Sequence, residues 1–129
     1  NGYTYSAHPV SCAAALKNIE IFENERILEN VRNVSPHFQH RLKHLMKYDI
    51  VGDARGMGLL GCIECKAEDL EAERSLGSKI DEACEELGLL VRPLINMAVF
   101  SPPLIITIEQ IDEMFDILEA AIIKVENNL

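Results

Sequence analysis

Three glycines, Gly56, Gly58 and Gly61, have the G-x-G-x-x-G spacing of loops that bind the pyrophosphate of a dinucleotide. Asp81 follows at about the distance from which an acidic residue contacts the ribose. The motif works only where a strand precedes it and a helix follows it, so that the phosphates meet a helix N-terminus. Here the stretch LLGCIEC alternates like a strand, and no helical period begins before about residue 70. Nucleotide binding is therefore an alternative that the surrounding sequence disfavours.

Cys62 and Cys65 form a C-x-x-C pattern, which is typical of zinc and redox sites. In an extended strand, residues three apart point to opposite faces, so these two thiols would not meet on one ion. Cys12 and Cys84 lie within helical patterns and are interpreted as small core residues. The cysteines therefore favour a structural role over a metal site.

Three histidines, His37, His40 and His44, are spaced so that they could share one face of a helix. Arg41 and Lys43 lie among them, and no Asp or Glu of the same segment completes a set of metal ligands. A solvated helix face is the simpler interpretation, and a metal site is the alternative.

Two further places could bind an anion. Thr4 and Ser6 lie just before a helix expected to start near Pro9, where unpaired N–H groups and the helix dipole attract negative charge, although the same hydroxyls could simply cap the helix. Arg92 precedes Pro93, which favours an extended backbone, and its guanidinium could hold a carboxylate through two parallel bonds. An internal salt bridge would explain Arg92 equally well.

The apolar periodicity predicts the elements that position these residues. Helices are expected over about 9–25, 27–46, 70–87 and 107–129, and strands within 48–65, 89–93 and 97–106. This order predicts one domain of the α+β class, with a small mixed or antiparallel sheet of about three or four short strands packed with about four helices.

Three local features of these helices are specific enough to test. Leu16, Ile19 and Phe22 are expected to face inward from the first helix. Pro36 is expected to kink or restart the second. Thr107 and Gln110 have the spacing of a capping box at the start of the last.

Composition limits the class of function. Twelve basic against twenty-one acidic residues give a formal charge of -9, the wrong sign for a surface that neutralises nucleic acid phosphates. Hydrophobic residues make up 48% of the chain, but no run has the length of a membrane span, and no leader peptide is evident. We expect a globular domain, no nucleic acid or membrane partner, and a cytoplasmic location, since the cysteines need not form disulfides.

Three segments together resemble a known family. GYTYSAHPVSCAAAL, GDARGMGLLGCIE and LLVRPLINMAVFSPPLIIT, in this order and before an amphipathic last helix, resemble the C-terminal small domain of class III pyridoxal-phosphate-dependent aminotransferases of the omega-amino acid:pyruvate type. The resemblance spans nearly the whole chain. It implies an enzyme that transfers an amino group from an omega-amino acid or amine to a keto acid such as pyruvate.

The resemblance also implies roles for single residues. Thr4 corresponds to the residue that contacts the cofactor phosphate of the neighbouring subunit, and Arg92 to the residue that binds the substrate carboxylate. Ala7 stands where many relatives have glycine, which should alter the flexibility of the loop more than its chemistry. No catalytic residue is expected in this chain, because the family's Schiff-base lysine and the Asp that pairs with the cofactor ring lie upstream, in the large domain.

We therefore expect residues 1–129 to be one domain, a C-terminal fragment that is inactive and binds no pyridoxal phosphate alone. Its partners would be the large domain, the second subunit of a homodimer, and the small-molecule amine and keto acid. Residues 1–7 are expected to be mobile without that partner surface. The alternative is a free-standing, non-catalytic interaction domain with the same fold.

Overall fold

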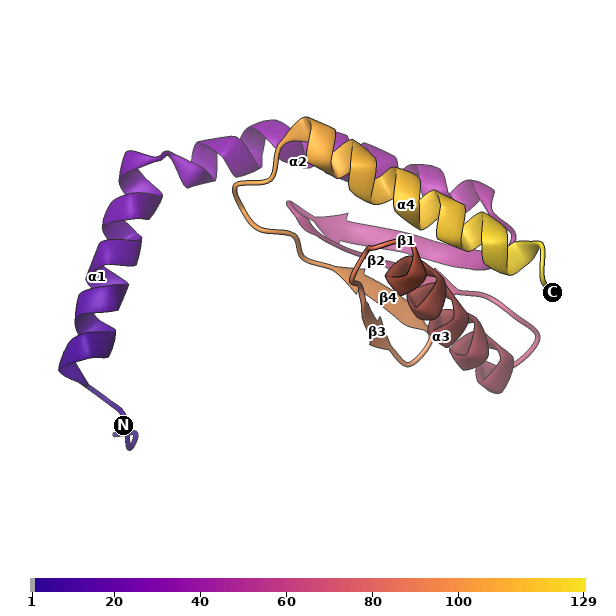
Figure 1. The fold of residues 1–129 in the computed structure, drawn as a ribbon, viewed down its shortest axis with the longest axis horizontal. Coiled ribbons are helices and arrows are strands. Elements are labelled where there is room, and N and C mark those ends of the chain that lie inside the picture. Colours follow the sequence, from indigo (N-terminus) through magenta and orange to yellow (C-terminus); the bar gives the residue numbers. More distant parts are fainter. Residues whose placement is uncertain (1) are drawn as a thin grey trace.

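A computed structural model describes residues 2–129 and shows a sheet packed against helices (Figure 1). The strand order is β1-β2-β4-β3, and all three pairs of neighbours are antiparallel. The elements are α1 (Pro9–Asn24), α2 (Ile27–His44), the 3-10 turn η1 (Leu45–Lys47), β1 (Val51–Met57), β2 (Leu60–Cys65), α3 (Leu70–Glu86), β3 (Arg92–Leu94), β4 (Met97–Phe100) and α4 (Ile108–Glu126). The α+β class is confirmed, and the sheet is antiparallel.

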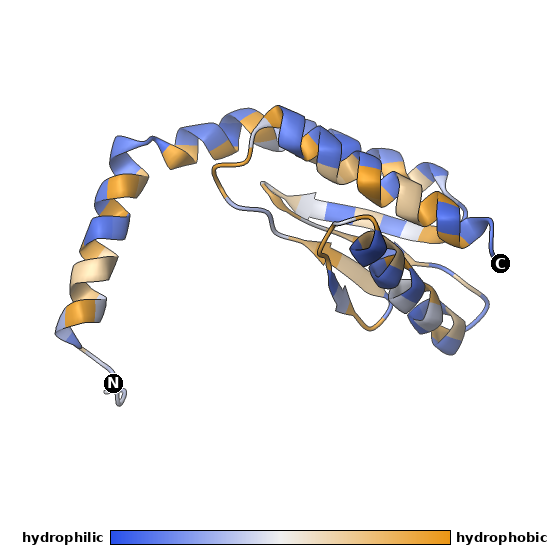
Figure 2. Cartoon of the chain, viewed as in Figure 1, coloured by the Kyte–Doolittle hydropathy of each residue, from blue (hydrophilic) through white to orange (hydrophobic). Residues whose placement is uncertain are grey.

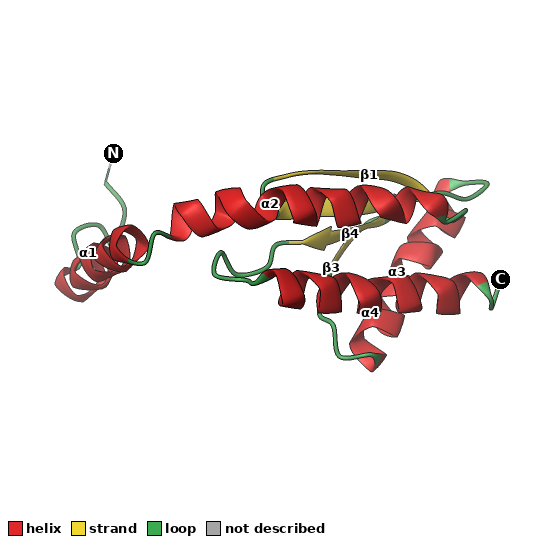
Figure 3. Ribbon diagram, turned by 90° about the horizontal axis from the view of Figure 1, so that it is seen from above, coloured by secondary structure: helices red, strands yellow, loops and turns green. Residues whose placement is uncertain are grey.

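One face of the sheet is buried. The register places Ala54, Ile63 and Ala98 side by side on β1, β2 and β4, and all three are fully buried. The helices α2 and α3 pack against the sheet, α4 packs against both of these helices, and α2 and α4 run alongside one another (Figures 1 and 3). The residues that alternate with this buried row therefore lie on the opposite face, which no helix covers in the described part of the chain.

Aromatic side chains fill the space between the helices and the sheet. The ring centroids of Phe38 on α2 and Phe115 on α4 are 5.2 Å apart in an edge-to-face arrangement, and the centroid of Phe100 on β4 is 6.5 Å from that of Phe115. Phe38 and Phe115 are fully buried. Such contacts favour one relative placement of the two helices and the sheet.

Helix α1 extends away from this body (Figure 1). Its bounds agree with the sequence prediction, but its expected inward face does not, because no residue of α1 is fully buried and only Phe22 of the three expected residues is half-buried. Leu16 is 70% exposed and Ile19 is 55% exposed, and Figure 2 shows apolar turns along the whole helix. The apolar side chains of Leu16 and Ile19 therefore have no matching surface among residues 2–129.

Helix α2 passes through Pro36 as one continuous helix, so the expected restart does not occur, and the expected kink stays a prediction. Ser35, the residue before it, directs its Oγ to the Val31 carbonyl. Buried Val34 and Phe38 on either side of Pro36 hold both halves of the helix against the core. Packing therefore offsets the backbone hydrogen bond that a proline removes.

The glycines of the G-x-G-x-x-G motif have structural roles in the β1–β2 hairpin. Gly58 has a φ of 61° in the turn, a conformation that glycine adopts readily. A Cβ on Gly56 would lie 2.3 Å from the Leu60 carbonyl oxygen, and one on Gly61 would lie 2.7 Å from Leu42 Cδ2. The motif joins two strands, so it lacks the helix that dinucleotide binding requires.

The strand predicted over 97–106 ends at Phe100, and a turn follows it. This turn is closed by the Ile106 N–H, which donates to the Pro103 carbonyl at 3.0 Å. Asn30 on α2 donates from Nδ2 to the carbonyls of Leu104, at 2.9 Å, and Ile106, at 3.2 Å. The turn is thus fastened to α2 directly before α4 begins.

The capping box at the start of α4 is confirmed. The Thr107 side chain accepts from the Gln110 N–H, and the Gln110 side chain accepts from the Thr107 N–H. The apolar stripe that follows, from Ile111 to Val125, is buried as its spacing predicts. No helix among residues 2–129 is both long and apolar enough to cross a bilayer.

Candidate functional site

Thr4 lies in an exposed turn before α1. The Ser6 N–H donates to the Tyr3 carbonyl, and Ser6 Oγ accepts from the Tyr3 N–H, both at 3.0 Å. No side chain caps α1, so Ser6 stabilises the turn and not the helix. The Thr4 hydroxyl and the N–H groups of Thr4 and Tyr5 make no hydrogen bond within residues 2–129. The turn therefore presents three free donors to an acceptor from outside.

Ala7 ends this turn with a φ of 59°. This left-handed conformation is accessible to glycine without strain but costs a residue with a Cβ about 1–2 kcal/mol. A glycine at this position, which the family resemblance implies, would adopt this backbone conformation more readily. The expected mobility of 1–7 stays a prediction, and Asn1 lies outside the described residues.

Arg92 is the first residue of β3 and lies on the uncovered face of the sheet. The register pairs Arg92 with Val99, Val99 with Cys62, and Cys62 with Arg55, so these four residues form one row across the four strands. Arg92 is exposed, and within residues 2–129 no carboxylate lies within salt-bridge distance of it. The alternative of an internal salt bridge for Arg92 is therefore not found in this part of the protein.

Arg55, at the other end of the row, is fully engaged. Its Nη1 donates to Asp53 Oδ2 at 2.7 Å and to Glu64 Oε2 at 2.6 Å, and its Nη2 lies 3.3 Å from Met97 Sδ. The hydrogen bonds to Asp53 and then Glu64 raise the pKa of Arg55, and the hydrogen bond from Arg55 lowers the pKa of Asp53. The two arginines of the uncovered face thus differ, because one is neutralised and the other is free.

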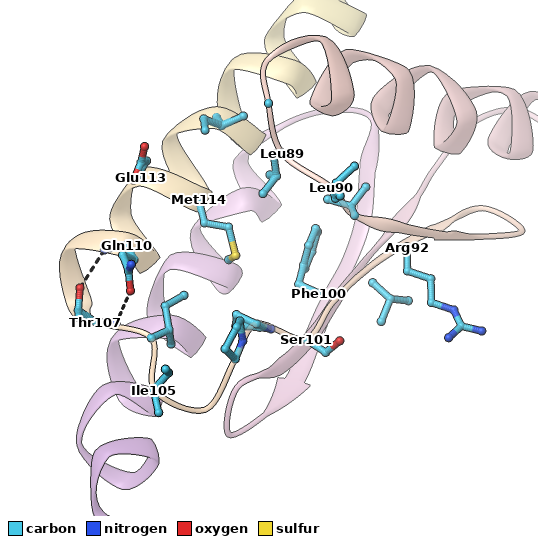
Figure 4. A pocket seen from close by; sticks show the side chains of 17 residues that line it. Leu89, Leu90, Arg92, Phe100, Ser101, Ile105, Thr107, Gln110, Glu113 and Met114 are labelled. Atoms are coloured by element: carbon cyan, nitrogen blue, oxygen red, sulfur yellow. Dashed lines mark hydrogen bonds between the residues drawn. The ribbon is translucent and has the colours of Figure 1, made fainter. Parts of the chain in front are cut away.

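A pocket of about 930 Å³ lies beside Arg92, between the segment before β3, the turn after β4 and the start of α4. Leu89, Phe100, Ile106 and Met114 give it mainly apolar walls (Figure 4). Arg92 is at its rim, and its guanidinium extends away from Met114 (Figure 4). The pocket can accept an apolar group next to a cation.

The two residues to which the sequence assigns site roles lie far apart. Thr4 is in the turn at the outer end of α1, whereas Arg92 is on β3, an edge strand of the sheet in the body of the structure (Figure 1). One copy of the chain therefore does not bring them to one ligand. Sequence reasoning missed Asp53, Arg55, Glu64 and Asn30; the i, i+2 spacing of Asp53 and Arg55 on a strand was the signal available.

The other candidates of the sequence do not gather into a site. His37 pairs with Asp112, and no cluster of His, Cys, Asp or Glu in the described chain could hold a metal ion. Burial raises the pKa of the Cys65 thiol to about 11 and that of Cys84 to about 12, so both stay protonated at neutral pH. Cys12 is exposed, so its assignment as a core residue was wrong.

The family model for class III aminotransferases, "Aminotransferase class-III", matches residues 1–122. The chain belongs to the class III aminotransferase family. This membership and the antiparallel sheet confirm the resemblance read from the three sequence segments.

Two curated relatives in this aminotransferase family are similar to the chain. Over 100% of the chain it is 37% identical to gamma aminobutyrate transaminase 3, chloroplastic, of Solanum lycopersicum, and over 88% it is 37% identical to putrescine–pyruvate aminotransferase of Pseudomonas aeruginosa. The chain spans 26% of the length of each of these relatives.

A solved aminotransferase extends the comparison to three dimensions. A PLP-bound aminotransferase mutant from Vibrio fluvialis superimposes with a TM-score of 0.89 at 40% identity, over 99% of this chain and 29% of that one. The class III aminotransferase fold of this chain is therefore a part of a larger enzyme fold in its relatives.

Proposed function

We propose that the full-length protein is a pyridoxal-phosphate-dependent aminotransferase that moves an amino group from an omega-amino acid or primary amine to a keto acid such as pyruvate. The names of the gamma-aminobutyrate and putrescine–pyruvate relatives support both donor types. This chain would be the small C-terminal domain of a homodimer and inactive alone. The cytoplasmic location stays a prediction, and one relative is chloroplastic.

The observation that carries this proposal is the free guanidinium of Arg92. It is the unpaired arginine on the uncovered sheet face, and an apolar pocket lies beside it. A carboxylate can accept two parallel hydrogen bonds from a guanidinium, which fixes the orientation of the substrate as well as its charge. We assign Arg92 the carboxylate of the amino acid or keto acid.

The turn around Thr4 fits the phosphate of the cofactor. A phosphate offers several acceptor oxygens, and the turn presents a hydroxyl and two N–H groups that have no acceptor among residues 2–129. When bound, pyridoxal phosphate supplies an electron-accepting ring for the amino-group transfer. Thr4 and Arg92 of one copy lie far apart in space. We therefore assign the phosphate contact of Thr4 to the cofactor of the neighbouring subunit.

The proposal is tested by replacing Arg92 with alanine in the full-length protein. Rates with 4-aminobutanoate and with butylamine are compared, because these donors differ by one carboxylate. We expect kcat/KM for 4-aminobutanoate to fall about 10- to 100-fold, as expected for the loss of a charge-assisted bidentate contact, and that for butylamine to change little.

Arg32→Ala is the matched control. Arg32 is exposed on α2 and makes no ion pair within residues 2–129. It should leave both rates unchanged. Equal losses for both donors in Arg92→Ala would remove Arg92 from the site, and the absence of any transamination by the full-length protein would favour the interaction-domain alternative.

A further inference from the structure

The uncovered sheet face carries charges of both signs in two neighbouring rows. One row runs from Arg55 through Cys62 and Val99 to Arg92. The adjacent row runs from Asp53 through Glu64 and Met97 to Leu94. Two carboxylates therefore share a face with the arginine that would bind the substrate.

Arg55 forms ion pairs with both of these carboxylates. Its Nη1 lies 2.7 Å from Asp53 Oδ2 and 2.6 Å from Glu64 Oε2. Each of the three side chains is between 38% and 48% exposed, so the pairs are accessible to water and not locked in the core. Their geometry is set by the strands, because Asp53 and Glu64 are cross-strand partners and Arg55 lies two residues from Asp53.

Glu64 and Arg92 are separated by one intervening strand, β4. Strands lie about 4.8 Å apart in a sheet, so the backbones of β2 and β3 are about 10 Å apart in the pairing direction. The two residues lie in neighbouring rows of the same uncovered face, because Glu64 is in line with Leu94, two residues from Arg92. Both have long, flexible side chains, so a released Glu64 carboxylate can turn toward the Arg92 guanidinium. A Glu64 carboxylate without Arg55 would thus be an internal competitor for the Arg92 guanidinium.

We propose that Arg55 is a positioning residue for substrate binding: it holds Asp53 and Glu64 on the far side of the sheet and so keeps Arg92 free for the carboxylate of the substrate. The proposal rests on the proposed function of Arg92. It explains why two arginines on one face have different tasks. The specificity for carboxylate substrates then depends on the charge balance of the whole face and not on Arg92 alone.

The test compares Arg55→Gln with the double variant Arg55→Gln/Glu64→Gln in the full-length protein. We expect Arg55→Gln to raise KM for 4-aminobutanoate about two- to fivefold, the range of an exposed ion pair, and to leave kcat and the KM for butylamine unchanged. The double variant should restore the KM for 4-aminobutanoate, because the competing carboxylate is gone. A merely structural role of Arg55 predicts no such rescue.

Arg26→Gln is the matched control. Arg26 is also exposed and also pairs with a glutamate, since its Nη1 is 3.6 Å from Glu29 Oε2, but it lies at the start of α2, away from the sheet face. This variant removes one positive charge and releases one carboxylate. It should leave the KM for both donors unchanged, and a rise equal to that of Arg55→Gln would overturn the proposal.

A binding measurement separates this inference from the proposed function. Calorimetric titration of the full-length protein with butanoate reports carboxylate binding without turnover. If Arg92→Gln leaves butanoate affinity unchanged, the assignment of Arg92 fails. If Arg92→Gln weakens binding but Arg55→Gln does not, or if Glu64→Gln fails to rescue Arg55→Gln, the role of Arg55 is wrong while that of Arg92 stands.

Discussion

His37 Nε2 lies 2.7 Å from Asp112 Oδ1 and joins α2 to α4. Arg41, one turn further along α2, donates to the same Asp112 oxygen and to Asp116. The guanidinium of Arg41 also lies over the Phe115 ring, 5.6 Å from its centroid. The two helices are therefore held together by a polar contact at the edge of the aromatic core.

This contact predicts a pH dependence of stability. Hydrogen bonds from His37 and then Arg41 lower the pKa of Asp112 from its ordinary value of 3.8. A lowered pKa in the folded state contributes stability above the ordinary value, and that contribution is lost as the pH falls through the folded-state value. Urea unfolding between about pH 2 and 6 should show this loss in the wild-type chain, and Asp112→Asn should flatten it.

Glu113→Gln is the control for Asp112→Asn. Glu113 is exposed on the same helix and makes no ion pair within residues 2–129. It should keep the pH profile of the wild type. A profile for Asp112→Asn as steep as that of the wild type would assign the acid sensitivity to other carboxylates.

The backbone conformation of Ile95 leads us to expect that a substitution there stabilises the protein. It has a φ of 61° in the β3–β4 turn and is 57% exposed, so it takes a left-handed conformation with little burial in return. This conformation costs about 1–2 kcal/mol for a residue with a Cβ, whereas glycine pays mainly in unfolded-state entropy, about 0.4–1 kcal/mol. Ile95→Gly should raise the free energy of unfolding by about 0.5–1 kcal/mol, and Ile95→Val, which keeps the strain, should not.

The close packing around Gly61 leads us to expect that a larger residue there destabilises the protein. A Cβ at this position would lie 2.7 Å from Leu42 Cδ2 and 3.0 Å from Phe38 Cε1, both in fully buried side chains. Gly61→Ala should lower the free energy of unfolding by about 1–3 kcal/mol, as overpacking of a core does. Gly58→Asn should be nearly neutral, because asparagine tolerates a positive φ and the nearest atom to a Cβ there is 3.8 Å away. Equal effects of the two changes in urea unfolding would contradict this account.

The hydrogen bonds of Asn30 are expected to stabilise the turn before α4. Its amide donates to the carbonyls of Leu104 and Ile106, so Asn30→Asp would replace a donor by a charged acceptor facing two oxygens. We expect a loss of about 1–3 kcal/mol in stability and faster hydrogen exchange of the Ile106 amide. Asn33→Asp places the same charge on an exposed position of the same helix and should do neither.

The hydroxyl of Thr4 is expected to contribute to the cofactor affinity of the full-length protein. Thr4→Val keeps the size of the side chain and removes the hydroxyl, and we expect it to raise the dissociation constant for pyridoxal phosphate about tenfold, as the loss of one charge-assisted hydrogen bond would. Thr4→Ser retains the hydroxyl and should bind normally. Identical affinities for the two variants, measured by the absorbance of the bound cofactor, would argue against a phosphate contact.

The sequence predicted what depends on near neighbours along the chain. The capping box of Thr107 and the buried stripe that follows it in α4 are set by spacing within one helix. The inward face expected for Leu16 and Ile19 was wrong because their spacing is helical but no surface of residues 2–129 packs against them. The pairing of Arg55 with Glu64 depends on strand register, which the order of residues alone did not supply.

Helix α1 extends away from the body, so its length sets how far the Thr4 turn lies from α2. The helix has 16 residues, which span about 24 Å at 1.5 Å per residue. Inserting one residue would shift the Thr4 turn along the axis and rotate it by about 100°, whereas replacing one exposed side chain would leave its position unchanged. The number of residues in α1 thus sets both the distance and the direction of the Thr4 turn from the start of α2.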